Sequence, residues 1–304
     1  MTRKIHARPF LKWAGGKTQL ISEIEKCLPR EVSAEKFTYV EPFVGSGAVL
    51  FWMLSKFPNL EKVVINDINA DLINAYRVIA ASPQELIAVL QELQRQYHAL
   101  PHAEAEKKEY YYQKREIYNA RKSDKITHAA LFIFLNRTCF NGLYRVNKSN
   151  LFNVPMGSYK QPTICDEQNI LAVSTTLQNV DIISGDFEDT IALATSTSFF
   201  YLDPPYKPLN ATSGFNSYAK DEFGDNEQIR LNTFCKRLDE LGCKWLLSNS
   251  DNQHDDFFAR IYNGYFVKRV NALRIINSKP DKRGKISELL INNFKAQGSY
   301  TYGK

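Results

Sequence analysis

The sequence predicts an α/β protein with a doubly wound, mostly parallel sheet, because strand-like and helical runs alternate along most of the chain. In the first part, apolar runs at 37–41 and 63–66 are typical of buried strands and enclose a helix at about 48–56. The alternation resumes with strands at 180–184, 199–202 and 245–248 and a helix at 225–241. Helices that connect parallel strands in this way cover both faces of the sheet.

Two departures from the alternation complete the predicted architecture. From 75 to 137 the periodicity is helical without a clear strand, which predicts an inserted, mainly helical region. The runs GYFVKRVNALRI and KISELLINNF flank a basic turn, NSKPDKRG, and predict an antiparallel hairpin at the C-terminal edge. We therefore expect a discontinuous domain at 1–74 and 166–304 that carries the sheet, and an inserted domain at 75–165. Ligands of such sheets bind at the carboxyl ends of the strands.

The composition narrows the class of protein. The chain has 304 residues, 44% of them hydrophobic, but no apolar run approaches the roughly 18 residues of a membrane span. The basic start MTRKIHARPF lacks the apolar segment of a signal peptide, so we expect a cytoplasmic protein without a membrane partner. The five cysteines are scattered and never spaced as CxxC, which predicts reduced thiols. Pro101 separates His98 from His102, and with no third ligand nearby we expect no metal site.

The charge is concentrated in one region. Residues 101–160 contain 11 Lys or Arg against 5 Asp or Glu, a balance of +6 that equals the net charge of the whole chain. A basic, tyrosine-rich insert in an otherwise balanced protein favours a polyanionic partner. The alternative is a solvated helix of mixed charge, which AEAEKKEYYYQKREIYNARKSDK also fits.

The segment FFYLDPPYK is the most informative motif. Pro204 ends the strand at 199–202, because proline has no N–H to donate to the sheet. The stiff turn that follows presents the Asp203 carboxylate, the Pro204 carbonyl and the aromatic face of Tyr206. Two acceptors and a ring can hold a planar amine such as the exocyclic amine of a base. An ordinary strand-to-loop exit is the alternative interpretation.

A second strand end carries a cofactor signal. YVEPFVGSG runs into Gly45 and Gly47 before a helix, which lets a ligand approach the backbone closely. The next strand ends at Asp67, 22 residues after Gly45, where an acidic residue suits the hydroxyls of a ribose. Leu50 occupies the position of a third glycine, so a nucleoside ligand is favoured over a dinucleotide.

Two further segments add candidate ligand contacts. The segment FLKWAGGKTQL imitates the end of a P-loop, but the earlier glycine falls on Leu11 and no strand precedes it. Trp13 and Lys17 instead suit an aromatic and cationic lid over a charged ligand, the alternative being a buried tryptophan that anchors the amino terminus. Asp186 and Phe187, in SGDF at the end of another strand, are placed to meet the base edge of the same ligand.

Together these motifs resemble a known family. PFLKWAGGK, YVEPFVGSGA, VINDINADLINAY, DPPY and RGKISELLINNF are similar, in order, to the Dam-type DNA adenine methyltransferases, the alpha group of amino methyltransferases. LNRTCFNGLYRVN followed by FNVPMGSYKQP resembles the target-recognition β-hairpin of members that modify adenine in GATC. The resemblance implies the S-adenosylmethionine-dependent methyltransferase fold, with the recognition region inserted between the cofactor half and the catalytic half.

The resemblance implies a cofactor and a reaction. S-Adenosyl-L-methionine would lie across the strand ends, with its ribose on Asp67 and its methionine part near Trp13, Lys17 and the Gly45 loop, leaving S-adenosyl-L-homocysteine as product. Asp203 and the Pro204 carbonyl would accept the two hydrogens of the adenine amine, and Tyr206 would stack on the base. Asp203 would also lie near the cofactor amino group.

The resemblance also implies contacts with double-stranded DNA. The target adenine must leave the duplex, and Phe140 and Asn141 would hold the gap. Phe140 stands where related proteins often carry tyrosine, a change that keeps stacking. Arg145 would contact a guanine in the major groove through two hydrogen bonds. The other implied contacts are Leu143 and Pro155 with a thymine methyl group, Lys12 with the outer guanine, and Asn147 and Tyr159 with the DNA backbone.

Other functions stay open at this point. DPPY also occurs with cytosine in DNA or adenine in RNA as substrate, whereas enzymes acting on protein glutamine usually show Asn in place of Asp203. A catalytically silent DNA-binding regulator would show damaged cofactor motifs. We expect a bacterial or phage protein that is a monomer in solution. It would act either as a solitary enzyme or as the partner of a cognate restriction endonuclease.

Overall fold

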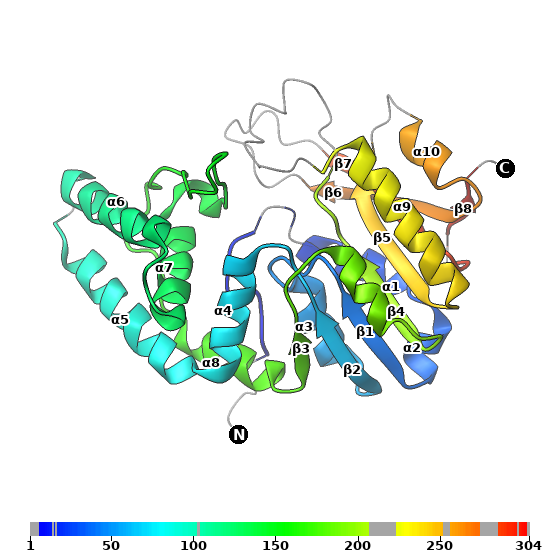
Figure 1. Cartoon of the computed structure of the whole chain (residues 1–304), viewed down its shortest axis with the longest axis horizontal. Coiled ribbons are helices and arrows are strands. Elements are labelled where there is room, and N and C mark those ends of the chain that lie inside the picture. The colour runs from blue at the N-terminus through cyan, green and yellow to red at the C-terminus, as the bar shows by residue number, and fades with distance from the viewer. Residues whose placement is uncertain are drawn as a thin grey trace.

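The architecture is one eight-stranded sheet with helices on both faces and a helical group at one end (Figure 1). The computed structural model describes residues 6–13, 15, 17–101, 104–206, 223–251, 256–273, 285–296 and 298–302. The strand order is β3-β2-β1-β4-β5-β7-β6-β8. The strands are β1 (Phe37–Glu41), β2 (Leu60–Ile65), β3 (Val180–Ile182), β4 (Ser198–Leu202), β5 (Lys244–Ser250), β6 (Phe266–Leu273), β7 (Lys285–Asn292) and β8 (Tyr300–Thr301).

The sheet is parallel from β3 through β5 and antiparallel beyond it. β1 pairs in parallel with both β2 and β4, so segments from before and after the helical insert meet within the sheet. β7 pairs antiparallel with β5 and with β6. The predicted fold class and C-terminal hairpin are therefore confirmed, while the basic turn 274–284 lies outside the described residues.

Helices cover the sheet on two sides. Successive residues of a strand point to opposite faces, so Tyr39 packs into one core cluster and Val40 into the other. The helices are α1 (Ile21–Lys26), α2 (Arg30–Ala34), α3 (Ala48–Lys56), α4 (Ala70–Ala81), α5 (Pro83–Ala99), α6 (Glu104–Ala120), α7 (Lys125–Thr138), α8 (Glu167–Leu177), α9 (Asp225–Glu240) and α10 (Phe257–Ile261). Helices α9 and α10 supply residues to the second cluster, and the other long helices supply the first.

The helical group consists of α5, α6 and α7, which Figure 1 shows beside the end of the sheet formed by β2 and β3. Its entry is fixed by Asn69, whose side chain accepts from the backbone N–H groups of Asp71 and Leu72 and so caps α4. Asp124 caps α7 in the same way. Helix α4 begins at Ala70 and runs across the boundary between positions 74 and 75, where the sequence placed the start of the insert.

The N-terminal segment joins the sheet to the helical group. The Asn136 side chain on α7 accepts from the Lys12 backbone N–H at 2.9 Å and donates to the Lys12 carbonyl at 2.8 Å. Arg137 donates to the Phe10 carbonyl at 2.8 Å. The Asn169 side chain on α8 likewise accepts from the backbone N–H of Arg8 and donates to its carbonyl. The segment is thus held by helices that come more than 120 residues later.

Several boundaries differ from those predicted. The strand predicted at 63–66 begins earlier, at Leu60. The prediction missed its first three residues because they are exposed or half-buried and give no continuous apolar signal. The strand predicted at 180–184 ends at Ile182. The recognition hairpin pairs through two isolated antiparallel bridges, Cys139 with Met156 and Val146 with Phe152, rather than through continuous strands. A 3₁₀ turn at Phe140–Gly142 and Pro155, which has no N–H to donate, interrupt regular pairing.

All five cysteines are free thiols, as predicted. Within the part of the chain that the structure describes, no helix combines the length and the apolar character needed to cross a membrane.

Candidate active site

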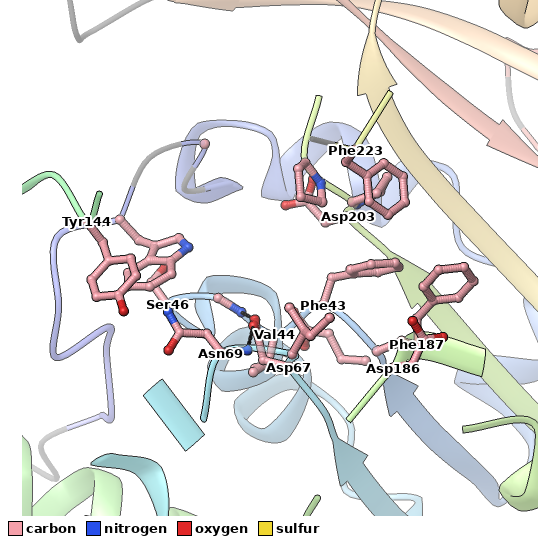
Figure 2. Close-up of a pocket in the computed structure, with 18 of the residues that line it drawn as sticks. Phe43, Val44, Ser46, Asp67, Asn69, Tyr144, Asp186, Phe187, Asp203 and Phe223 are labelled. Atoms are coloured by element: carbon pink, nitrogen blue, oxygen red, sulfur yellow. Dashed lines mark hydrogen bonds between the residues drawn. The ribbon is translucent and has the colours of Figure 1, made fainter. Parts of the chain in front are cut away.

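A cavity of about 1270 Å³ opens at the carboxyl ends of the parallel strands. This volume exceeds the ~300–1,000 Å³ of most ligand pockets, so it suits more than one ligand group. Figure 2 shows Asp67 and Asp203 on opposite sides, with Tyr144 at one end and Phe187 at the other. The predicted residues that line it are Trp13, Lys17, Gly45, Asp67, Asp186, Phe187, Asp203, Pro204 and Tyr206.

The loop after β1 is held against the loop after β2. The Asp67 carboxylate accepts from the Gly45 N–H at 3.1 Å and from the Asn69 N–H at 2.9 Å. Gly45 has a φ of +49°, and a Cβ there would lie 3.1 Å from the Trp13 ring. Gly47 does not line the cavity; its φ of +75° starts α3, and a Cβ there would meet the Tyr76 hydroxyl at 2.5 Å. The two glycines therefore let Trp13 and Tyr76 pack on the loop.

The cavity holds carboxyl groups whose pKa values are raised by burial. Burial raises the pKa of Asp67 to about 6, although N–H groups of Asn69 and Gly45 oppose the shift. Burial also raises the pKa of Glu41 well above its ordinary value, and Asp203 and Asp67 add to this effect. Glu41 is 2% exposed and accepts from the Tyr39 hydroxyl at 2.8 Å. A cationic ligand would stabilise the charged form of these groups.

Asp203 is positioned by two donors on one oxygen. Lys17 Nζ and the Ser248 hydroxyl both lie 2.9 Å from Oδ1, and Tyr201 in turn contacts Ser248. Among the described residues, none hydrogen-bonds Asp203 Oδ2 or the Pro204 carbonyl, whereas the next carbonyl, that of Pro205, accepts from α9. Burial raises the pKa of Asp203, and Lys17 and Ser248 oppose the shift. The turn therefore keeps two acceptors available in the cavity.

Tyr206 is fixed by a carboxylate that the motif did not reveal. Its hydroxyl donates to Glu288 on β7 at 2.7 Å, and Lys17 Nζ lies 4.4 Å from the centroid of its ring. Glu288 also lies 4.0 Å from Lys17, and its pKa is raised chiefly by burial. The ammonium of Lys17, 4% exposed, is thus surrounded by Asp203, Glu288 and an aromatic face. Lys17 therefore holds Asp203 and Tyr206 of the DPPY turn, rather than covering the cavity from outside.

Asp186 and Phe187 meet α9 at the other end of the cavity. Asp186 forms an ion pair with Arg230, which also contacts Glu188 and Glu227. The Arg230 guanidinium lies 4.5 Å from the centroid of the buried Phe187 ring. Asp186 caps the 3₁₀ turn Phe187–Leu193, so its side chain already serves two structural partners.

The predicted DNA contacts lie on the hairpin and beside it. Phe140 is 45% exposed, and Asn141 is exposed with a φ of +55°. Lys12 lies 4.2 Å from the centroid of the Tyr159 ring, which joins two predicted contacts from distant segments. Pro155 is exposed, and its carbonyl accepts from the Phe140 N–H.

Three of the predicted DNA contacts, Arg145, Asn147 and Leu143, also contact other residues of the protein. Arg145 Nε donates to the Asn153 side chain at 2.7 Å, which orients the guanidinium. The Asn147 carboxamide oxygen accepts from the backbone N–H groups of Ser149 and Leu151, so its amide N–H₂ is the end available to DNA. Leu143 is half-buried and packs against the core cluster.

Sequence reasoning missed Glu41, Glu288, Arg230 and Asp71, which contribute to the site or line the cavity. Glu41 stands inside the quoted YVEPF motif and Asp71 inside VINDINADLINAY, so a signal existed for both. Arg230 and Glu288 approach the site only through packing of α9 and β7. Among the described residues, no cluster of three His, Cys, Asp or Glu is suited to a metal ion; His102 lies outside them.

Comparison with known proteins identifies the class that this site defines. Residues 13–276 match the D12 class N6 adenine-specific DNA methyltransferase family. The chain belongs to that family and is an adenine-specific DNA methyltransferase.

The sequence similarity to individual relatives extends over nearly the whole chain. A type II methyltransferase of Methanocaldococcus jannaschii is 50% identical, over 95% of this chain and 100% of that protein. A type II methyltransferase of Lactococcus lactis is 39% identical, over 96% and 97%. The DNA adenine methylase of Escherichia coli is 35% identical, over 93% and 94%. The suspected family is thus confirmed, and it implies S-adenosylmethionine as methyl donor.

The residues present fit that donor. S-Adenosylmethionine carries a sulfonium and an ammonium group, and the cavity holds the buried Glu41 and the half-buried Asp67 and Asp203, whose carboxyl groups all have raised pKa values. Its nucleoside suits the part of the cavity between the Gly45 loop and Asp67, both of which line it. The cavity is also large enough for a second, planar group beside the cofactor.

Proposed function

We propose that this enzyme transfers the methyl group of S-adenosyl-L-methionine to the exocyclic amine of an adenine flipped out of duplex GATC. The observation that carries the proposal is the state of the DPPY turn. Asp203 Oδ2 and the Pro204 carbonyl have no hydrogen-bond partner among the described residues, while the neighbouring Oδ1 and Pro205 carbonyl are engaged. Two acceptors that no described residue engages, in a turn that lines the cavity, match the two hydrogens of an amine.

The chain's own residues would orient and polarise the adenine. Its amine lone pair is delocalised into the ring, and donation of both hydrogens to Asp203 and Pro204 favours the pyramidal form that attacks a methyl carbon. Tyr206, fixed through Glu288, would stack on the base. As the N–C bond forms, positive charge develops on nitrogen, and the ionised Asp203 stabilises it at no cost in reorganisation. When bound, the cofactor would supply an electrophilic methyl group, because its sulfonium becomes a neutral thioether once the methyl group is transferred.

No strong base is required in this scheme. The amine nitrogen becomes acidic only once it is cationic, so a proton passes readily to the Asp203 carboxylate or to water. Lys17 then serves to hold Asp203 in register, since its ammonium lies 2.9 Å from Oδ1. We assign the ribose to Asp67, the methionine part to Trp13, Lys17 and the Gly45 loop, and the adenine edge of the cofactor to Asp186 and Phe187.

The inserted region 75–165 would read the DNA. Phe140 and Asn141 are exposed at the turn of the hairpin, where they can fill the gap left by the flipped base. Arg145, oriented by Asn153, is assigned to one guanine and Lys12 to the other. The remaining assignments are Leu143 and Pro155 to a thymine methyl group and Asn147 and Tyr159 to the DNA backbone.

The proposal also concerns the setting in which the enzyme acts. Two relatives are named type II methyltransferases and others DNA adenine methylases, so both a cognate restriction endonuclease and a solitary role have support. Flipping of one adenine by one cavity requires one copy of the chain, and we propose a monomer.

The test is methyl transfer from tritium-labelled cofactor to three duplexes that contain GATC, premethylated GATC, or GATC with one guanine replaced. We expect label on the first duplex alone, recovered as N6-methyladenine after digestion to nucleosides. Label in cytosine would overturn the proposed substrate base. Equal label on the first and third duplexes would overturn the proposed site while leaving the chemistry intact.

A further inference from the structure

A buried carboxylate lies between the cavity and the hairpin. Asp71, in the first turn of α4, is 6% exposed. Its Oδ1 accepts from Arg121 Nη1 at 2.9 Å and lies 3.0 Å from His128 Nε2. Its Oδ2 accepts from the Tyr118 hydroxyl at 2.7 Å, from Arg121 Nη2 at 3.1 Å and from the Tyr144 hydroxyl at 3.3 Å. One side chain thus joins α4, α6, α7 and the hairpin.

The network keeps Asp71 ionised. Burial alone would raise its pKa, but hydrogen bonds from His128, Tyr118 and Arg121 outweigh burial and hold the pKa below its ordinary value. Hydrogen bonds to a charged acceptor are the stronger kind, and removing a buried charge leaves its donors unpaired. The four side chains around Asp71 therefore share one arrangement that depends on its charge.

The network reaches the predicted cofactor contacts through the chain. Asp67 accepts from the Asn69 N–H at 2.9 Å, and the Asn69 side chain accepts from the Asp71 N–H at 3.1 Å. These alternate residues form one continuous cap at the start of α4. Figure 2 shows Asp67 and Asn69 among the residues that line the cavity. A ligand that orders Asp67 orders the backbone that carries Asp71.

The network reaches the predicted DNA contacts through Tyr144. This residue lies between Leu143 and Arg145, and its ring stacks on Trp13 with centroids 5.5 Å apart and planes 19° apart. Tyr144 and Val146 line the cavity, whereas their neighbours in sequence are the residues assigned to DNA. Arg121 also donates to the carbonyl of Asn150, in the other part of the hairpin, at 3.3 Å.

We propose that Asp71 is the positioning residue that couples cofactor binding to DNA reading, by holding Tyr144 and Arg121 where the cofactor pocket and the hairpin meet. The inference rests on the proposed function. Cofactor in the cavity would order Trp13 and Tyr144, and the hairpin would then bind DNA at a lower cost in conformational entropy. Coupling of this kind is reciprocal, so DNA must strengthen cofactor binding by the same factor.

The test measures that factor directly. The affinity for S-adenosyl-L-homocysteine is determined by titration calorimetry with and without saturating GATC duplex, and the affinity for the duplex with and without the cofactor product. For the wild type we expect the two ratios to agree, within the roughly 5- to 150-fold range typical of coupled sites. In Asp71→Asn we expect both ratios to fall below threefold, with the affinity for the cofactor product alone changed less than the coupling.

Two further variants separate coupling from loss of stability. Asp239→Asn is the matched control, because Asp239 accepts from Trp245 and Asn293 at 2.8 Å and from Tyr265, away from the cavity. It should lower the melting temperature and keep the wild-type ratios. Tyr144→Phe keeps the ring on Trp13 and removes only the hydroxyl, so it should fold and show reduced ratios even if Asp71→Asn unfolds.

Three results would overturn the inference: a wild-type ratio of one, wild-type ratios in both Asp71→Asn and Tyr144→Phe, or an equal loss in Asp239→Asn. Failure of the proposed function is a different result, namely a folded wild type that transfers no methyl group to GATC duplexes.

Discussion

Replacement of Asp203 by asparagine tests the catalytic assignment most directly. The variant keeps the shape of the side chain and an acceptor for the Ser248 hydroxyl, which lies 2.9 Å from Oδ1. It removes the charge that faces Lys17 and places an N–H₂ group where an amine hydrogen should be accepted. We expect methyl transfer to fall steeply while specific binding of GATC duplex is retained, because the hairpin is untouched.

The magnitude follows from the interactions lost. A charge-assisted hydrogen bond to the amine contributes about 1.5–3 kcal/mol, and stabilisation of the developing charge about 2.7–4 kcal/mol. Together these correspond to a loss of roughly 10³- to 10⁵-fold in the rate of transfer. Stability should also fall, because Lys17 is 4% exposed and, among the described residues, keeps only Glu288, at 4.0 Å, as an anionic partner. Breaking a buried pair costs about 3–5 kcal/mol, and Glu288 should lower that cost.

Single-turnover methylation and thermal unfolding separate the two effects. Lys17→Met combined with Asp203→Asn removes the unpaired ammonium, so it should recover much of the melting temperature without recovering transfer. Ser248→Ala is the control, since it removes one hydrogen bond and keeps the charge pair; transfer should fall by about tenfold at most. A rate within tenfold of wild type in Asp203→Asn would refute the assigned role of the carboxylate.

The other predictions concern binding, reading and stacking. Cofactor hydroxyls favour the charged form of Asp67, whose pKa is about 6, so affinity for S-adenosyl-L-homocysteine should be full above pH 6 and fall by up to about tenfold per unit below it. A flat calorimetric profile would mean that the ribose lies elsewhere. Arg145→Ala should lower discrimination at one guanine by roughly 1–3 kcal/mol, whereas Lys148→Ala, if it contacts phosphate alone, should weaken binding to all duplexes and lower the salt slope by about one; equal rate losses on every duplex in Arg145→Ala would exclude base reading. Tyr206→Phe keeps the ring but frees it from Glu288, and should lower the single-turnover rate by roughly tenfold, in line with one hydrogen bond; an unchanged rate would show that the tether is unimportant.

The features that the sequence revealed are those written in consecutive residues. The DPPY turn and the Gly45 loop both follow apolar strands, and in a parallel sheet such ends meet at one edge. The structure adds that β1 and β4 are neighbours in the sheet, so the two loops follow adjacent strands. The family resemblance then supplied the cofactor and the base.

The features that the sequence did not reveal arise from packing between distant segments. Glu288 reaches Tyr206 only because β7 pairs with β5, and Arg230 reaches Asp186 only because α9 lies over the second core cluster. The hairpin was predicted as paired strands, but Pro155 and the turn at Phe140–Gly142 limit it to two bridges. No local periodicity records such choices, because they depend on partners far away in the chain.

The hydrogen bonds that hold the N-terminal segment against α7 matter for engineering new target sites. An exchange of residues 75–165 between relatives assumes that this insert alone determines the target sequence. Lys12, assigned to the outer guanine, lies outside the insert. Its backbone is nevertheless held by Asn136 and its side chain lies over Tyr159, both of which belong to the insert. A chimera that transplants the insert alone would join mismatched halves of one reading surface. Residues 10–12, which Asn136 and Arg137 hold, should therefore travel with the insert as a second and separate graft.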